Sequence, residues 1–307
     1  MIFTHAACFG HEPGAGHPES PARLRAVMEA LAEPQFRDIP VLDAPAATRA
    51  ELARAHHAAH VALVFDHAPA HGIVRIDADT TMSPGSLEAA LRAAGAVRAA
   101  VDAVVAGPSR RAFCAVRPPG HHATHDVPMG FCLFNNVAVG ALHAIAAHDI
   151  ARVAIVDFDV HHGNGTQDIF WRDDRVLYES THQFPLYPGT GRPDERGAGN
   201  IVNAVLPPGA GSAAFRAACE STILPALDAF APELLIVSAG FDAHHLDPLA
   251  ALDLATDDYA WITRKLVALA EKHAQGRVVS ALEGGYSLQA LRESVSAHCG
   301  ELFGIAG

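Results

Sequence analysis

The sequence predicts an α/β fold in which one parallel β-sheet is covered by helices on both faces. Short apolar runs alternate along the chain with longer segments of helical spacing. The apolar runs are nearly continuous, as expected for strands buried on both faces. No linker-like stretch or internal repeat interrupts this pattern. We therefore expect a single domain over residues 1–307.

Six apolar runs are expected to be strands, at residues 113–116, 153–158, 176–178, 201–206, 234–237 and 278–282. Helices are expected to begin at Ser20-Pro21, Ser83-Pro84, Asn136, Ser212, Asp257 and Ser287. The second of these helices should stop at Gly107-Pro108, the third at about residue 147 and the fifth at Gly276. Pro225 should kink or divide the fourth, because proline removes a backbone donor.

The charge balance argues against one class of function. Lys and Arg number 22 against 34 Asp and Glu, which gives a formal charge of -12. A nucleic-acid-binding protein needs a basic face to neutralise phosphates, and the sequence has no cluster of Lys and Arg. We therefore expect no direct nucleic-acid binding. An acidic surface also favours cationic substrates.

Other bulk features predict a cytoplasmic protein. The 5 cysteines lack the spacing of a disulfide framework, which is typical of reduced thiols. The first residues show no basic region followed by an apolar core, so no signal peptide is expected. The longest weakly polar run, at residues 137–147, is too short to cross a membrane.

Polar side chains at the ends of two apolar runs predict a metal site. Asp157, Asp159 and His161 stand at alternate positions, so an extended strand would point them to one side. Such charges at a buried strand end are costly unless a divalent cation compensates them. Asp and His ligands with an open position for water are typical of catalytic zinc. Asp242 ends another run and is the best third ligand, although Asp there is more often a turn or N-cap residue.

Two further segments should bring polar groups to the same sheet edge. Residues 117–122 read Arg-Pro-Pro-Gly-His-His, a stiff turn followed by His121 and His122; a polar loop without function is the alternative. Residues 283–286 read Glu-Gly-Gly-Tyr, in which paired glycines let the backbone approach a ligand closely. The hydroxyl of Tyr286 could hold an oxyanion, or the residue could be structural.

Taken together, these segments resemble the histone deacetylase superfamily, which includes acetylpolyamine amidohydrolases and acetoin-utilisation proteins. The resemblance covers nearly the whole chain, and its motifs stand in the family's order. They are His-Pro-Glu at 17–19, Arg-Pro-Pro-Gly-His-His at 117–122, Met-Gly-Phe-Cys at 129–132, Asp-Phe-Asp-Val-His-His-Gly-Asn-Gly-Thr-Gln at 157–167, Tyr-Pro-Gly-Thr-Gly at 187–191, Ser-Ala-Gly-Phe-Asp at 238–242 and Glu-Gly-Gly-Tyr at 283–286. The resemblance implies a single arginase/deacetylase-type domain with an eight-stranded parallel sheet flanked by helices.

The resemblance also implies a zinc-dependent amidohydrolase that removes an acetyl or similar acyl group from an amine such as acyl-lysine. It gives the zinc three ligands: Asp159, His161 and Asp242. It makes His122 the general base, His121 an electrostatic partner oriented by Asp157, and Tyr286 the oxyanion donor. Asn164 stands where some relatives have Asp; an amide fixes the tautomer of His122 without adding a charge.

Substrate and cation sites follow from the same resemblance. The residues assigned to the substrate are Phe131 and Tyr187 as aromatic tunnel walls, with Gly130, Leu249 and Asp79. Leu249 lies near the place where polyamine-selective relatives carry Glu, which argues against that selectivity device. A structural potassium ion would bind beside the zinc strand, at Asp157 and Ser180.

Other interpretations compete with an acyl-lysine deacylase. An acetylated polyamine or another small amide would use the same chemistry. A non-catalytic acyl-amine-binding protein would be expected to lack a zinc ligand, His122 or Tyr286, and all of these are present. A two-metal hydrolase of arginase type would need a second carboxylate-rich ligand set, and Asn164 is neutral. The donor set also accepts Fe(II) or Co(II). No feature of the sequence predicts the oligomeric state.

Overall fold

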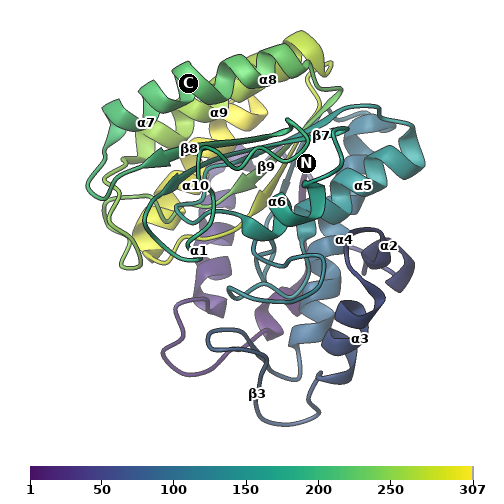
Figure 1. Ribbon diagram of the computed structural model, residues 1–307. Helices are drawn as coiled ribbons and strands as arrows, with labels where there is room; N and C mark the ends of the chain where they lie inside the picture. The colour runs from purple at the N-terminus through teal and green to yellow at the C-terminus, as the bar shows by residue number, and fades with distance from the viewer. Residues whose placement is uncertain (306–307) are drawn as a thin grey trace.

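Strands and helices alternate along the chain in the computed structural model, which describes residues 1–305 (Figure 1). The strands of the main sheet are β1 (Ile2–Thr4), β2 (Val41–Asp43), β5 (Arg111–Cys114), β6 (Val153–Asp157), β7 (Val176–Gln183), β8 (Ile201–Leu206), β9 (Leu234–Ala239) and β10 (Val278–Leu282). They lie in the order β2-β1-β5-β10-β9-β6-β7-β8, and every neighbouring pair is parallel. This is the eight-stranded parallel sheet that the resemblance implied. A small antiparallel pair, β3 (Val74–Arg75) and β4 (Thr81–Met82), stands apart from it.

Helices cover both faces of the sheet. They are α1 (Pro21–Leu31), α2 (Arg49–Ala55), α3 (Ala58–Asp66), α4 (Ser86–Val105), α5 (Asn136–His148), α6 (Asn164–Phe170), α7 (Ser212–Ala218), α8 (Leu224–Phe230), α9 (Thr256–His273) and α10 (Leu288–Phe303). Figure 1 shows α4 and α5 on one side of the sheet, and α7, α8, α9 and α10 on the other. Among the described helices, none combines the length and the apolar character needed to span a membrane.

The central strands are buried on both faces, as their unbroken apolar runs predicted. Every residue of β6, β9 and β10 is buried. Burying one large aliphatic side chain stabilises a fold by about 1.5–3 kcal/mol, so this layer holds the sheet firmly. The carboxyl ends of these three adjacent strands therefore form a rigid base for the loops that follow them.

Several element boundaries differ from the prediction. β1 and β2 were not predicted, because each has three residues and all of β2 is exposed. The short helices α2, α3 and α6 were also missed. The helix expected at Ser83 begins at Ser86, since Ser83 instead hydrogen-bonds with the Ser86 side chain. The segment opened by Ser212 is divided by a π-helical turn at Cys219–Ile223, just before Pro225.

A buried ionic network ties the start of α1 to the sheet edge. The Glu19 carboxylate is inaccessible to solvent and accepts hydrogen bonds from the guanidinium groups of Arg117 and Arg23. Arg117 also donates to the carbonyl oxygens of Cys8 (2.8 Å) and His11 (3.0 Å). Burial opposes ionisation of Glu19, but Arg117 and His11 outweigh it and hold the pKa of this carboxyl far below its usual range.

The substitution Glu19→Gln should lower the free energy of unfolding by about 3–5 kcal/mol, because it leaves two buried guanidinium groups without a compensating charge. Urea denaturation followed by circular dichroism measures this change. Glu29→Gln, at an exposed position of the same helix, is the matched control and should shift stability by less than about 0.5 kcal/mol. Equal stabilities of the two variants would contradict the role given to Glu19.

Acid should destabilise the fold through buried neutral imidazoles. His298 lies in the core, where its two ring nitrogens hydrogen-bond with Thr263 (2.6 Å) and Ser280 (2.8 Å), and burial lowers its pKa to about 3. In the unfolded chain His298 is protonated below about pH 6.5, whereas in the folded chain it stays neutral down to about pH 3. The free energy of unfolding therefore falls as pH decreases through this window. We expect His298→Asn to reduce this pH slope by up to about 1.4 kcal/mol per pH unit in urea titrations. An unchanged slope would contradict the assignment.

Candidate active site

Three polar side chains meet beyond the carboxyl ends of β6 and β9. Asp159 and His161 follow β6, and Asp242 follows β9. Their ligand atoms all lie within 4.8 Å of one another. His161 Nδ1 is 3.1 Å from an oxygen of Asp159 and 3.2 Å from Asp242 Oδ2. Ligands in open α/β sheets bind at this edge, so the position agrees with the chemistry predicted for the trio.

Asp157 is not part of this trio, although strand alternation predicted that it would point to the same side as Asp159 and His161. β6 ends at Asp157, and the turn that follows brings Asp159 and His161 round to Asp242. The Asp157 carboxylate instead accepts hydrogen bonds from His121 Nδ1 (2.9 Å) and the Tyr178 hydroxyl (3.1 Å). Alternation fails here because it holds only while the chain stays extended.

The donor set fits a divalent cation. Asp242 Oδ2 is buried and accepts no hydrogen bond, and its 3.2 Å contact with His161 Nδ1 is an ion pair when that ring is protonated. Burial and the nearby Asp159 carboxylate raise the pKa of Asp242 to about 7. Burial disfavours a charge on His161, but Asp159 and Asp242 outweigh it and raise its pKa to about 10. A cation would relieve the repulsion between the carboxylates. A Cβ atom at Gly284 would overlap both, so only glycine leaves room for them.

The two histidines after β5 have different electrostatic environments. His122 Nδ1 donates to Asn164 Oδ1 (2.8 Å), which leaves the Nε2 lone pair free. Burial, together with His121 and His161, holds the pKa of His122 well below its usual value. For His121 burial also opposes protonation, but Asp157 and Asp159 outweigh it and raise the pKa well above its usual value. The two rings therefore differ electrostatically: the surroundings favour the neutral form of His122 and the imidazolium form of His121.

Tyr286 lies on the loop after β10 and lines the same cavity as His122. Its backbone N–H donates to Asp247 (2.7 Å), and the Arg23 guanidinium lies 4.9 Å from the centre of its ring. Burial raises the pKa of the Tyr286 hydroxyl well above its usual value. The hydroxyl therefore stays protonated and is able to donate a hydrogen bond at neutral pH.

The residues predicted to contact substrate line one cavity of about 220 Å³. Its lining is Asp79, His122, Gly130, Phe131, His161, Leu186, Tyr187, Leu249 and Tyr286. Tyr187 and Leu249 are 38% and 36% exposed, so they lie towards its mouth. Leu186 was not predicted, since nothing distinguishes one Leu in a loop from a packing residue. The cavity thus has aromatic and aliphatic walls above a polar base that includes His122 and His161.

Two other buried groups complete the surroundings of the site. Ser180 pairs in register with Asp157, and its hydroxyl lies 2.9 Å from His182 Nδ1. Glu283 was not given a role from the sequence, yet its carboxylate accepts from the backbone N–H groups of Gly120 (2.6 Å) and His121 (3.1 Å). Its place directly after a buried strand was the signal that could have identified it.

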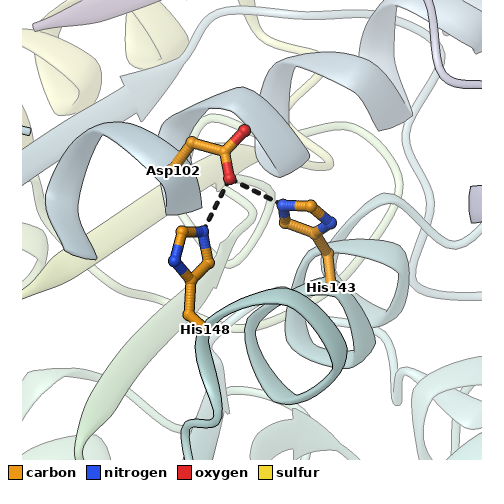
Figure 2. Close-up of side chains that lie close together, drawn as sticks. All are labelled: Asp102, His143 and His148. Atoms are coloured by element: carbon orange, nitrogen blue, oxygen red, sulfur yellow. Dashed lines mark hydrogen bonds and ion pairs between the residues drawn. The ribbon is translucent and has the colours of Figure 1, made fainter. Parts of the chain in front are cut away.

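A second cluster of His and Asp lies away from this site, between α4 and α5 (Figure 2). Figure 2 shows His143 and His148 pointing at the same oxygen of Asp102, each through Nε2 at 2.7 Å. Arg98 donates to the other oxygen (2.9 Å), and Arg54 donates to His143 Nδ1, so the proton of His143 is on Nε2. These are charge-assisted hydrogen bonds that satisfy the carboxylate. We therefore interpret this cluster as a clasp between two helices rather than a metal site.

Comparisons with known proteins identify the family. The family model described as "Histone deacetylase domain" matches residues 17–302. "Histone deacetylase-like amidohydrolase" of Pseudomonas aeruginosa is 42% identical over 89% of this chain and 73% of its own length. "Probable deacetylase" of Archaeoglobus fulgidus is 40% identical over 94% of this chain and 81% of its own. A solved structure described as "Crystal Structure of HDA15 HD domain" has a TM-score of 0.93 at 37% identity and covers 99% of this chain and 88% of that one.

The chain belongs to the histone deacetylase family. It is an enzyme of the deacetylase type, a hydrolase that acts on amide bonds.

Proposed function

We propose that this enzyme is a zinc-dependent deacylase that removes an acetyl or similar acyl group from an amine such as acyl-lysine. One observation carries the proposal. One cavity brings together the free Nε2 of a neutral His122 and the protonated hydroxyl of Tyr286. His161, from the trio of Asp159, His161 and Asp242 that fits a divalent cation, lines the same cavity. A base, an oxyanion donor and an open metal site are the parts that amide hydrolysis requires.

The proposed zinc ligands are Asp159, His161 and Asp242. When bound, zinc would polarise the substrate carbonyl and lower the pKa of a water molecule. The support is the buried Asp242 oxygen that accepts no hydrogen bond and the crowding of two carboxylates beside one imidazole. Fe(II) and Co(II) suit the same donors and are the alternative metals.

The protein's own residues would carry the protons. His122 Nε2 takes a proton from the attacking water, because Asn164 holds its other nitrogen protonated. Asn164 is itself oriented by a contact from Nδ2 to the sulfur of Met129 (3.4 Å). The Tyr286 hydroxyl donates to the oxyanion of the tetrahedral intermediate. The charged His121 stabilises the developing negative charge, and the histidine pair returns a proton to the leaving amine.

The walls of the cavity favour a slender, apolar chain behind the acyl group. Phe131 and Tyr187 offer aromatic faces for methylene groups, and Leu186 and Leu249 extend the apolar lining. Asp79 at the same cavity and the net charge of -12 favour an amine-bearing substrate. Acyl-lysine is therefore the substrate class we propose, with acylated polyamines as the alternative that shares this chemistry.

We also propose a structural potassium ion beside the zinc strand, at Asp157 and Ser180. His182 Nε2 donates to the carbonyl of Gly191 (2.9 Å), so His182 Nδ1 accepts the proton of the Ser180 hydroxyl. The lone pairs of the Ser180 oxygen are then available to a cation. Oxygen donors next to a carboxylate suit such a hard ion.

A reducing compartment such as the cytoplasm is the location we propose. The 5 cysteines are free and buried in the fold, which is typical of a protein from a reducing compartment. A cell fractionation with an antibody against the protein tests this proposal.

Purified enzyme should bind one zinc ion per chain at the proposed trio. Asp242→Asn should lower zinc affinity by about 10- to 100-fold or more, because it removes the carboxylate whose buried Oδ2 accepts no hydrogen bond. Competition with a zinc-sensitive dye measures the affinity. Asp102→Asn, in the clasp between α4 and α5, is the matched control and should leave it unchanged. Loss of zinc in the Asp102 variant alone would reverse the assignment of the two clusters.

Zinc-loaded enzyme should hydrolyse at least one member of a panel of acetyl-lysine peptides, trifluoroacetyl-lysine and acetylated putrescine and spermidine. Tyr286→Phe and His122→Ala should each reduce kcat by about 10²–10⁴-fold, because one removes the oxyanion donor and the other the base. Both should keep their zinc. His148→Ala, a histidine substitution away from the cavity, should retain full activity. Zinc-bound wild-type enzyme that cleaves no member would sink the proposed function.

A further inference from the structure

The loop after β7 carries the tunnel wall Tyr187, and its place relative to the catalytic histidines is well defined. The ring of Tyr187 meets the ring of His122 edge-on, with centroids 5.1 Å apart and planes at 86°. The Tyr187 and His161 rings lie 6.3 Å apart at 77°. Tyr187 is 38% exposed, so packing around its own side chain is incomplete. Something else must hold the loop.

Three hydrogen bonds fix this loop at its far end. His162 Nδ1 and the Thr190 hydroxyl are 2.8 Å apart. The backbone N–H of Gly191 donates to Glu195 Oε2 (3.0 Å), and its carbonyl accepts from His182 Nε2 (2.9 Å). The backbone N–H and carbonyl of Gly191 are therefore both held by side chains, and a third side chain, His162, holds the hydroxyl of the neighbouring Thr190.

Gly191 brings the loop directly against two imidazole rings. Its φ is +89°, and a Cβ atom there would stand 2.5 Å from ring atoms of both His162 and His182. Only glycine tolerates this conformation and this approach. The loop therefore has one position in which its hydrogen bonds are made.

The same hydrogen-bond network leads to α6, the helix whose residue Asn164 contacts the proposed base His122. His162 Nε2 donates to Gln167 Oε1 (3.0 Å), and Gln167 Nε2 donates to Glu195 Oε2 (2.6 Å). Gln167 lies on α6, whose first residue, Asn164, accepts from His122. The helix α6 thus makes two contacts: Asn164, its first residue, accepts from His122, and Gln167, one turn later, bonds to His162 and Glu195. His162 and Glu195 in turn hold the loop that bears Tyr187.

We propose that Gln167, His162 and Glu195 are positioning residues that set the width of the substrate tunnel. They do so by fixing the distance between α6, which orients His122, and the loop that bears Tyr187. None of the three lines the cavity. The inference rests on the proposed deacylase function, because it concerns the fit of the chain that passes between these walls.

The two contacts of α6, from Asn164 to His122 and from Gln167 to the loop network, should affect different kinetic constants. Releasing the loop leaves the bond between Asn164 and His122 intact, so proton transfer is unaffected. It lets Tyr187 move, and the tunnel then contacts the methylene chain of the substrate less well. Such a loss acts on ground state and transition state alike, which raises KM and leaves kcat nearly constant.

The test is Glu195→Ala in the zinc-loaded full-length enzyme, with the best substrate of the panel. KM should rise by about 3- to 10-fold, the effect of one or two lost hydrogen bonds, while kcat changes by less than about 2-fold. Glu195→Gln keeps an acceptor for the Gly191 N–H and should restore most of the KM. Asp194→Ala removes an exposed carboxylate from the same segment and should behave like wild type.

A double-mutant cycle separates positioning from a general structural role. Tyr187→Ala removes the wall, so Glu195→Ala added to it should raise KM no further. Equal effects of Glu195→Ala with and without Tyr187 would overturn the inference, and so would a fall in kcat at constant KM. Wild-type turnover is measured alongside: its absence would refute the proposed function, whereas turnover with unchanged KM in Glu195→Ala would refute only this inference.

Discussion

Charge buried at the carboxyl edge of the sheet is the constraint to which the rest of this site is adapted. Asp159 and Asp242 lie on adjacent strand ends, with a single imidazole between them. Two carboxylates taken out of water repel each other, and their desolvation is costly unless positive charge is placed beside them. The proposed zinc answers this constraint, and the glycine at position 284 leaves the space in which the carboxylates converge.

Three other buried carboxylates near this edge are compensated in different ways. Asp157 receives an imidazole and a phenol, Glu283 receives two backbone N–H groups, and Glu19 receives two guanidinium groups. The differences matter for chemistry. The Asp157 and Asp159 carboxylates raise the pKa of His121 against the effect of burial. Burial and the neighbouring His121 and His161 lower the pKa of His122, and the uncharged Asn164 amide adds no carboxylate charge to oppose them. Neighbouring residues of one turn thereby acquire opposite electrostatic roles.

How far the sequence predicted this arrangement depended on the kind of signal. The strands β6, β9 and β10 were predicted because they are buried on both faces and therefore almost continuously apolar. Of β7 only residues 176–178 were predicted, because its second half, from Glu179 to Gln183, is polar although it is buried. β2 is exposed and three residues long, so it carried no such pattern. Alternation misplaced Asp157 because the strand ends there. Glu283 was overlooked because two of its partners are backbone N–H groups, which no residue type reveals.

The network around Glu19 has a consequence for where the catalytic unit begins. The family match starts at residue 17, yet the carbonyls of Cys8 and His11 accept hydrogen bonds from Arg117, whose chain leads within five residues to His122. A domain that began at residue 17 would lack the two carbonyl acceptors of the buried Arg117 side chain. The first sixteen residues therefore contribute to the fold around the proposed active site, although the family match begins after them.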